Sequence, residues 1–280
     1  MEEARASRTA LAAAAYRAAH QVVEQGRIFR DPLALRILGA DAEALVRDQG
    51  ADVARRMRVF IAARSRFAED RIVTTIERGL RQVVILGAGL DTFAYRTPAR
   101  EGLRIFEVDH PATQAWKRER LAAARIDVPA WLTFAAIDFE RQTLREGLRA
   151  GGFDEARETF FSLLGVVPYL TEDAVWSTLG FIAGTPGSAH VAFDYSDPPG
   201  ALAADGRAQH LDRASRVAAI GEPWLTHFVP VELHARMRTL GFTRVEDLGP
   251  AEVAERYLGA PRAERRAGGH LLYATNVRGQ

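Results

Sequence analysis

Two glycines and an acid could form a nucleoside-binding site in this sequence. Gly87 and Gly89 follow the apolar run Val83–Leu86, and Asp109 lies 20 residues after Gly89, at the end of a second apolar run. A buried parallel strand that ends in a Gly-x-Gly turn lets the backbone approach a ligand closely, and an acid after the next strand can accept hydrogen bonds from ribose hydroxyls. The spacing therefore predicts a nucleoside site, with Glu107 as a second candidate for the acid.

Position 92 indicates which nucleoside the turn could hold. Dinucleotide-binding turns follow the pattern G-x-G-x-x-G, and this chain has Thr92 where the third glycine would stand. Because that glycine permits close helix packing beneath a pyrophosphate, its absence argues against a dinucleotide. A nucleoside without phosphates, such as S-adenosylmethionine (SAM), needs only the tight turn and the acid. The coincidence of strand, turn and acid disfavours the alternative, in which the glycines serve the turn alone.

Composition excludes several classes of protein. The 280 residues are 48% hydrophobic, which is enough for a large core, and the net charge of +1 provides no strong field for nucleic acid or an anionic membrane. Lys117 is the only lysine, and the absence of cysteine excludes disulfides, thiolate nucleophiles and Cys-ligated metals. The N-terminal stretch lacks an uninterrupted apolar core, so we expect neither signal peptide nor membrane anchor, and a cytoplasmic protein.

The elements that would position the site change character near residue 80. Residues 1–80 show helical patterning with breaks at Gly26, at Asp31–Pro32 and at Gly79, which predicts a helical cap. From residue 82 strands alternate with helices, which predicts a doubly wound, mostly parallel α/β sheet with the nucleoside at the carboxyl ends of its strands. The helices are expected to start at His110–Pro111, at 141 and at Thr171, and the strands to span 82–86, 103–108, 132–137, 159–167, 189–193, 241–248 and 270–275.

Residues 196–230 interrupt this alternation after the fifth strand. An insertion at that point would lie over the ligand end of the sheet, so we expect a lid that selects the substrate. Its apolar residues Trp224, Leu225 and Phe228 favour a small, partly hydrophobic metabolite.

These motifs resemble the leucine carboxyl methyltransferase family of class I SAM-dependent methyltransferases, including its bacterial natural-product members. The resemblance spans nearly the whole chain and is most specific in QVVILGAGLDT (82–92), AYR (94–96), FEVDHP (106–111) and residues 64–70. It implies a Rossmann-like sheet with its last strand antiparallel, a cap at 1–80, a SAM-binding domain at 81–280 and the lid at 196–230. The activity implied is O-methylation in the biosynthesis of natural products.

The resemblance also implies roles for individual residues. Gly87, Ala88 and Gly89 would admit the amino-acid portion of SAM, and Asp109 would accept from both ribose hydroxyls. Arg64 would contact the carboxylate of SAM or of the substrate through its planar guanidinium. From the residues alone, the alternative for Arg64 is a solvated helix face whose charges pair with one another.

The adenine ring is expected to contact the end of the third strand. Asp138 would accept from the adenine amino group, while Ile137 and Phe139 flank the ring. The alternative for Asp138 is a helix N-cap. A departure from the family is Leu164, which stands where relatives commonly carry a cofactor-contacting Glu. Leu164 would then line the cofactor site. A second departure is Phe93, in place of a frequent Arg; Phe93 would pack or line an apolar pocket.

The most direct reaction is methyl transfer to a carboxylate of a small secondary metabolite. A carboxylate is ionised at neutral pH and needs no base. Arg64, Tyr169 and Tyr195 would orient it, although each tyrosine could equally be a packing residue with a hydrogen-bonded hydroxyl. A hydroxyl acceptor would require a base, for which His227 is the best placed histidine, with His234 and Asp194 behind it.

Other functions remain open from the sequence. Because of Leu164, one alternative is a SAM-binding protein that does not transfer methyl groups, such as a biosynthetic cyclase; another is a non-catalytic interaction protein. We find no metal-ligand spacing and no Gly-x-Ser-x-Gly elbow. The expected partners are SAM and a small-molecule carboxylate or hydroxyl substrate, with no nucleic acid and no membrane, in a monomer or homodimer.

Overall fold

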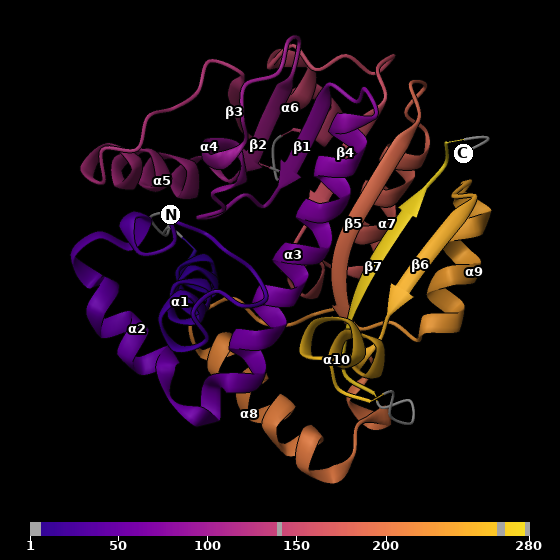
Figure 1. Ribbon diagram of the computed structural model, residues 1–280. Helices are drawn as coiled ribbons and strands as arrows, with labels where there is room; N and C mark the ends of the chain where they lie inside the picture. The colour runs from indigo at the N-terminus through magenta and orange to yellow at the C-terminus, as the bar shows by residue number, and fades with distance from the viewer. Residues whose placement is uncertain (1–6, 139–141, 262–266, 278–280) are drawn as a thin grey trace. The chain divides into compact units, whose positions relative to one another are not determined.

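The computed structural model describes residues 7–138, 142–261 and 267–277 (Figure 1). The chain forms two compact units. Met1–Thr74 and Val83–Phe153 make up the first unit, and Thr75–Gln82 and Asp154–Gln280 make up the second. The proposed boundary between cap and SAM-binding domain at residue 80 stays a prediction.

Within the described residues the strands form a seven-stranded sheet in the order β3-β2-β1-β4-β5-β7-β6. β2 and β3 are parallel, as are β4 and β5, whereas β7 is antiparallel to β5 and to β6. The mostly parallel, doubly wound sheet with an antiparallel last strand is therefore confirmed. The strands are β1 (Gln82–Leu86), β2 (Arg104–Asp109), β3 (Leu132–Ala136), β4 (Thr159–Leu163), β5 (Ala189–Ser196), β6 (Arg244–Leu248) and β7 (Gly269–Thr275).

The fourth strand is shorter than the sequence predicted. β4 ends at Leu163, and residues 167–169 form a short 3₁₀ helix, η3 (Val167–Tyr169). Gly165 has a φ of 70°, and its N–H donates to Asp194 Oδ1 at 2.5 Å. The predicted strand over 159–167 is therefore wrong beyond 163, because a glycine in the left-handed region turns the chain within an apolar run.

The N-terminal part of the first unit is helical, as predicted. Ala14, Ala15 and Ala18 on α1 are at most 1% exposed, and they belong to one core with the residues around Leu38. Small side chains at helical spacing let the following segments pack close to the helix axis. The helices of this unit are α1 (Arg8–Val23), η1 (Arg36–Asp41), α2 (Ala42–Gly50), η2 (Asp52–Ala54), α3 (Arg55–Glu77), α4 (Phe93–Arg96), α5 (Pro111–Ala123) and α6 (Leu144–Ala150).

Caps fix the starts of two helices that flank the candidate site. The His110 side chain accepts from the Ala112 N–H and Pro111 opens α5, which confirms the predicted start. α6 begins at Leu144 and not at 141, because Thr143 and Glu146 form a capping box. The alternative in which Asp138 caps this helix is therefore wrong.

The second unit contains α7 (Glu172–Ala183), η4 (Pro199–Ala201), α8 (Ala204–Ala219), α9 (Pro230–Leu240) and α10 (Pro250–Leu258). The Thr171 side chain accepts from Ala174 N and starts α7 as predicted. After α8, residues 222–229 have no regular secondary structure. There the Leu225 N–H donates to Pro168 O at 2.6 Å, and the Phe228 N–H donates to Ser196 O at 3.1 Å. The segment that follows α8 is thus tied to the loops at the carboxyl ends of β4 and β5.

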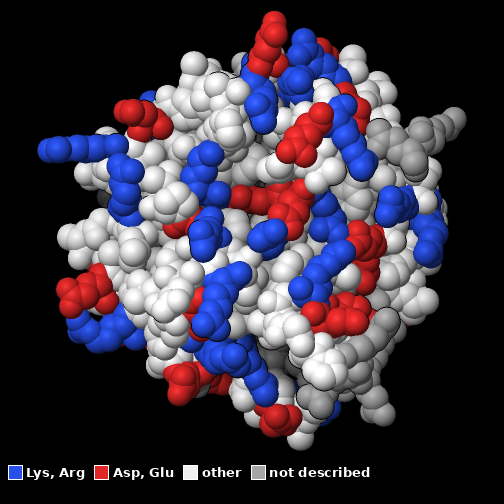
Figure 2. All heavy atoms as spheres, viewed as in Figure 1, with Lys and Arg blue, Asp and Glu red and all other residues white. Residues whose placement is uncertain are grey.

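On the face that Figure 2 shows, Lys and Arg side chains lie interspersed with Asp and Glu. This mixture agrees with the formal net charge of +1 and gives that face no field of a single sign. Among the described residues, no helix combines the length and the apolarity that crossing a membrane requires.

A buried group of titratable side chains joins three strands of the second unit. Asp247 on β6 accepts from the Tyr195 hydroxyl at 2.5 Å and lies 2.7 Å from His234 Nε2 and 3.0 Å from His270 Nδ1. His270 Nε2 lies 3.0 Å from Asp197 Oδ2. Burial alone would lower the pKa of His270, but the hydrogen bond and charge of Asp247, with those of Asp197, raise it. Burial would raise the pKa of Asp247, but its bonds from His270, Tyr195 and His234 lower it.

These shifts predict how stability depends on pH. Because the pKa of His270 is raised in the folded state, its protonation stabilises the fold fully below the unfolded pKa of about 6.5, and this stabilisation is lost as the pH rises through the folded pKa. Because the pKa of Asp247 is lowered in the folded state, its ionisation stabilises the fold above the unfolded pKa of about 3.9. Asp247→Asn should therefore cost on the order of 3 kcal/mol at pH 5–6 and less at pH 9. Thermal unfolding across this range measures the difference, with exposed Asp212→Asn as control. A loss independent of pH would contradict the assignment.

Candidate cofactor-binding site

The turn after β1 has the conformation that the glycines predicted. Gly87 and Gly89 have φ values of 62° and 42°, in the left-handed region that favours glycine. The Ala88 N–H donates to Val108 O at 3.0 Å, which continues the strand pairing into the turn. A Cβ on Gly89 would lie 2.9 Å from the Cβ of Ala10, so the start of α1 approaches the turn too closely for any larger residue.

Asp109 lies at the end of β2 and joins this turn to the next helix. Its Oδ2 accepts from the Gly89 N–H at 2.6 Å, and its Oδ1 accepts from the His110 N–H at 2.7 Å. An ionised carboxylate has about four acceptor positions. Each oxygen therefore keeps capacity for one further hydrogen bond, which matches the two hydroxyls of a ribose.

Burial raises the pKa of Asp109, and the N–H groups of Gly89 and His110 and the charge of Lys117 oppose that rise. The carboxylate of Asp109, which is partly buried, is thus held by fixed donors. Donors of this kind keep it ready to accept hydrogen bonds without prior rearrangement.

The residues predicted to contact adenine follow β3. Ile137 is fully buried, and its N–H donates to Asp109 O at 2.9 Å, so its backbone is hydrogen-bonded directly to that of Asp109. Asp138 is partly buried, and its backbone oxygen accepts from Gln142 N at 3.0 Å. Phe139 lies outside the described residues. The contact of Asp138 with adenine stays a prediction.

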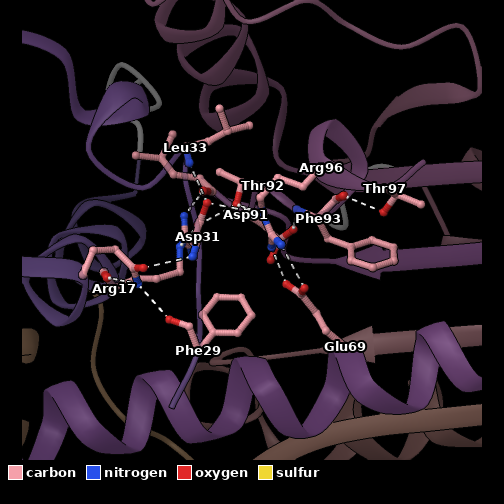
Figure 3. A network of polar contacts seen from close by, with 12 residues as sticks. Arg17, Phe29, Asp31, Leu33, Glu69, Asp91, Thr92, Phe93, Arg96 and Thr97 are labelled. Carbon is pink, nitrogen blue, oxygen red and sulfur yellow. Dashed lines mark hydrogen bonds and ion pairs between the residues drawn. The ribbon is translucent and has the colours of Figure 1, made fainter. Parts of the chain in front are cut away.

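Thr92 contributes a structural role that the sequence did not indicate (Figure 3). Its hydroxyl donates to Asp31 Oδ2 at 2.6 Å, and the side chain is 1% exposed. Arg17 on α1 donates to the same Asp31 oxygen at 2.7 Å and to Leu90 O at 2.6 Å. Asp31 therefore links α1 to the segment that follows the glycine turn. Where a dinucleotide site would need a small residue for helix packing, this chain has a buried hydrogen-bond donor.

Arg96 extends the same network to α3 (Figure 3). Its Nε donates to Thr92 Oγ1 at 3.0 Å and lies 3.3 Å from Asp31 Oδ1, and its other nitrogens donate to Glu69 at 3.0 and 2.5 Å. Burial raises the pKa of Glu69 to about 7 although Arg96 opposes the rise. Arg96 and the Asp31 network thus hold the segment after the turn between α1 and α3.

Arg64 lies on α3, in the same unit as the turn, and is partly buried. The neighbouring Arg66 is about half exposed and pairs with Asp70 at 2.6 Å, one helical turn later. Arg66 therefore lies on a solvent-exposed helix face whose charges pair with one another, which is the alternative given above for Arg64. The contact of Arg64 with a carboxylate of SAM or substrate stays a prediction.

A cavity of about 600 Å³ opens beside this network, between residues 26–30 and α3. Its lining includes Phe29, Arg66, Glu69 and Val73, and it includes none of the residues predicted to bind the cofactor.

The remaining predicted site residues belong to the second unit. Leu164 is partly buried at the end of β4, and Tyr169 is partly buried in η3. Tyr195 is 2% exposed, its hydroxyl donates to Asp247, and its ring stacks on His270 with centroids 4.7 Å apart. This is the packing arrangement described above as the alternative for Tyr195.

His227 is fixed by a polar contact at the end of β5. Its Nδ1 lies 2.9 Å from Ser196 Oγ, and its ring centroid lies 5.1 Å from that of His210, which in turn lies 5.0 Å from that of Trp224. Burial, followed by the charge of His210, lowers the pKa of His227. The imidazole is therefore neutral at pH 7, the form that can accept a proton. Among the described residues, no group of three or more His, Asp or Glu side chains has the geometry of a metal site.

Comparisons with known proteins show the family of this chain. The family model for leucine carboxyl methyltransferase matches residues 10–183. "Putative S-adenosyl-L-methionine-dependent methyltransferase YktD" of Bacillus subtilis (strain 168) is 35% identical over 195 residues, which cover 68% of this chain and 63% of that protein. A "Putative S-adenosyl-L-methionine-dependent methyltransferase" of Mycobacterium avium (strain 104) is 33% identical over 222 residues, 74% of this chain and 68% of that protein. The chain spans about two thirds of the length of these relatives.

A solved structure supports the fold. The crystal structure of "a putative methyltransferase from Thermobifida fusca YX" has a TM-score of 0.55 at 18% identity and covers 92% of this chain and 93% of that chain. At this identity the similarity shows the shared fold alone. The cofactor predicted from the sequence, SAM, agrees with the names of the relatives.

The Asp31 network predicts a stability effect at position 92. Thr92→Val keeps the shape of the side chain but removes the hydroxyl, so it leaves a buried Asp31 oxygen and Arg96 without that partner. We expect a loss of about 1–3 kcal/mol in the free energy of unfolding, measured by urea denaturation. Thr92→Ser, which retains the hydroxyl, is the matched control and should lose less. Equal losses in the two variants would show that the hydroxyl is not used.

Asp109 predicts a binding effect. Asp109→Ala removes both remaining acceptor positions and the anchor of Gly89, so we expect SAM to bind about 10²- to 10⁴-fold more weakly, as the loss of two charge-assisted hydrogen bonds implies. Calorimetric titration of SAM measures this loss. Exposed Asp127→Ala in the same unit is the control. An unchanged dissociation constant for Asp109→Ala would refute the ribose assignment.

Proposed function

Because the chain belongs to the leucine carboxyl methyltransferase family, we propose that it is a SAM-dependent O-methyltransferase that converts a carboxylate of a small secondary metabolite into a methyl ester. The observation that carries this proposal is the geometry of Asp109 at the glycine turn. Its carboxylate holds Gly89 at 2.6 Å and keeps one acceptor position on each oxygen. The names of the relatives favour methyl transfer and give no support to a cyclase or to a non-catalytic role.

The residues of the first unit fit the cofactor in the following way. Gly87, Ala88 and Gly89 would admit its amino-acid portion, and Arg64 would contact either its carboxylate or that of the substrate. Asp109 would accept from both ribose hydroxyls. Ile137 would flank the adenine ring and Asp138 would accept from its amino group, while the contacts expected of Phe139 and Leu164 stay predictions. When bound, SAM supplies a methyl group activated by the adjacent sulfonium.

The chemistry of a carboxylate acceptor asks little of the protein beyond positioning. A carboxylate oxygen bonds to the methyl carbon in line as the sulfur–carbon bond breaks, and no proton moves. Correct alignment of the reacting atoms can contribute about 7–11 kcal/mol in favourable cases. Arg64 and Tyr169 are the proposed orienting residues. Tyr195 is not included, because its hydroxyl is engaged by Asp247.

A hydroxyl acceptor is the second candidate, and the environment of His227 favours it. If His227 Nδ1–H donates to Ser196 Oγ, then Nε2 carries the lone pair and can accept a proton from a phenol or alcohol. The His210 ring lies beside the His227 ring, and Trp224 packs on the His210 ring. In this reaction the acceptor oxygen bonds to the methyl carbon while its proton passes to His227.

The segment at 196–230 supports a small metabolite in both cases. The part that follows α8 is bonded to Pro168 and Ser196 by main-chain hydrogen bonds, and Thr226 Oγ1 donates to Leu170 O at 2.5 Å. A segment fixed in this way would select among small molecules by shape. Its role as a lid is part of the proposal.

The two acceptor classes predict different behaviour of a single variant. We would incubate the protein with methyl-labelled SAM and panels of carboxylic acids, phenols and alcohols, and identify products by mass spectrometry. For a carboxylate acceptor, His227→Gln should change kcat less than about three-fold; for a hydroxyl acceptor it should lower kcat about 10²- to 10⁴-fold and abolish the acid limb of the pH profile. Tight SAM binding with no methylated product from any compound of these panels would contradict the proposed function.

A further inference from the structure

Lys117 on α5 is the only lysine of the chain, and it is 1% exposed. Its Nζ lies 2.7 Å from Oε2 of Glu107, which is also 1% exposed. The Tyr95 hydroxyl on α4 donates to the same oxygen at 3.1 Å, and Lys117 Nζ lies 5.4 Å from the centre of the Tyr95 ring. A buried ammonium is costly unless it is paired, so this ion pair needs an explanation. The methyl-transfer chemistry proposed above does not use it.

The pair lies next to the proposed ribose acid. Glu107 and Asp109 are two residues apart on β2, and side chains at that spacing point to the same face of a strand. The sequence offered both residues as candidates for the ribose acid. The structure separates them, because Glu107 bonds to Tyr95 and Lys117, whereas Asp109 bonds to the glycine turn.

The charge of Lys117 acts on both acids. Burial raises the pKa of Glu107 to about 7, and the charge and hydrogen bond of Lys117 oppose that rise. The same ammonium also opposes the rise that burial causes in the pKa of Asp109. A cation near a carboxylate favours its ionised form.

The other groups that face these acids are few. Asp91, in the segment after the glycine turn, adds a negative charge that acts on Glu107, and Tyr95 of α4 donates a hydrogen bond to it. His110, which follows β2, acts on Asp109 through its N–H and its charge. Lys117 from α5 is the group that acts on both carboxylates.

We propose that Lys117 is a positioning residue for the cofactor site: Glu107 holds its ammonium in place, and that ammonium supplies the positive charge for the face of β2 on which Asp109 would accept the ribose hydroxyls. Glu107 has the subordinate role, because it fixes the cation and, through Tyr95, ties α4 to β2. The inference rests on the proposed function of Asp109 as the ribose acid.

The choice of lysine in a chain whose other basic residues are arginines agrees with this role. Lys117 is enclosed between Glu107 and the Tyr95 ring, and an ammonium is a compact point charge, whereas a guanidinium is larger, planar and carries five donors. Lys117→Arg should therefore retain the electrostatic effect on Asp109 but pack less well.

The test separates the charge of Lys117 from the contact that it makes. Lys117→Met and Glu107→Gln both break the ion pair, but only the first removes the charge that acts on Asp109. We would measure the dissociation constant of SAM by calorimetry from pH 4 to pH 8 for these variants, for Lys117→Arg and for the double variant Glu107→Gln/Lys117→Met. Arg118→Met, which removes an exposed positive charge from the same helix, is the matched control.

The expected results differ in direction. In Lys117→Met, the pH below which SAM binding weakens should rise by about one unit, so that binding is roughly ten-fold weaker than in the wild type on that limb and similar at pH 8. Glu107→Gln and Lys117→Arg should show no upward shift. The double variant should shift as Lys117→Met does, and because it buries no unpaired charge it tests the same point if Lys117→Met does not fold.

Two results would overturn this proposal and leave the ribose assignment of Asp109 unaffected. One is an acid limb in Lys117→Met and in the double variant that coincides with that of the wild type. The other is an equal upward shift in Lys117→Met and Glu107→Gln, which would show that the pair serves only as a structural tie. If the wild type does not bind SAM, or if Asp109→Ala binds it as the wild type does, the ribose assignment and this proposal fall together. The Asp109→Ala measurement therefore distinguishes the two failures.

Discussion

The site depends on the pairing of buried charges around one turn. A carboxylate that leaves water must be met by a cation or by fixed hydrogen-bond donors, since an unpaired buried charge costs several kcal/mol. Around residues 87–96 the chain meets this requirement with partners from different elements. Asp31 forms ion pairs with Arg17 and Arg96, Glu69 pairs with Arg96, and Glu107 pairs with Lys117. The glycine turn keeps its shape because these pairs fix the segments on either side of it.

The same pairing gives the proposed site its electrostatic character. Asp109 accepts from two main-chain N–H groups and keeps capacity for two more hydrogen bonds. The other buried carboxylates are engaged by arginine, lysine or tyrosine side chains. Among the carboxylates named here, Asp109 is thus the one held by main-chain donors, as the proposed ribose acceptor requires. Binding a cofactor there would require no reorganisation of the partners that hold it.

Much of the fold could be predicted from local patterns. Alternation of strands and helices gave the doubly wound sheet, and capping residues located the starts of α5 and α7. Patterns failed where a single residue sets the end of an element: the turn at Gly165 follows the end of β4 within an apolar run, and the Thr143 cap starts α6 at Leu144. α10 was not predicted at all, although Pro250 at its first turn was a usable signal.

The site was predictable in part, for a similar reason. The glycines and Asp109 follow from spacing within one βαβ unit, which is local information. The links from Thr92 to Asp31 and from Lys117 to Glu107 join residues 61 and 10 positions apart in the sequence across different elements. Tertiary packing creates such partners, so no periodicity reveals them. The sequence offered two signals, an aspartate before a proline at Asp31 and a single lysine at Lys117. Neither signal indicates which residue the side chain will contact.

Because the only lysine of the chain is enclosed, its chemical modification can report local opening of the structure. Reagents that acylate amines require an exposed, neutral amine, and the one lysine side chain of this protein is 1% exposed. The rate at which Lys117 is acylated in the native protein would therefore follow the opening of α5 away from β2 and not the reactivity of the surface. Because α5 begins directly after Asp109 and His110, that rate would report how often the structure around the proposed ribose site opens, and a ligand bound there should slow it.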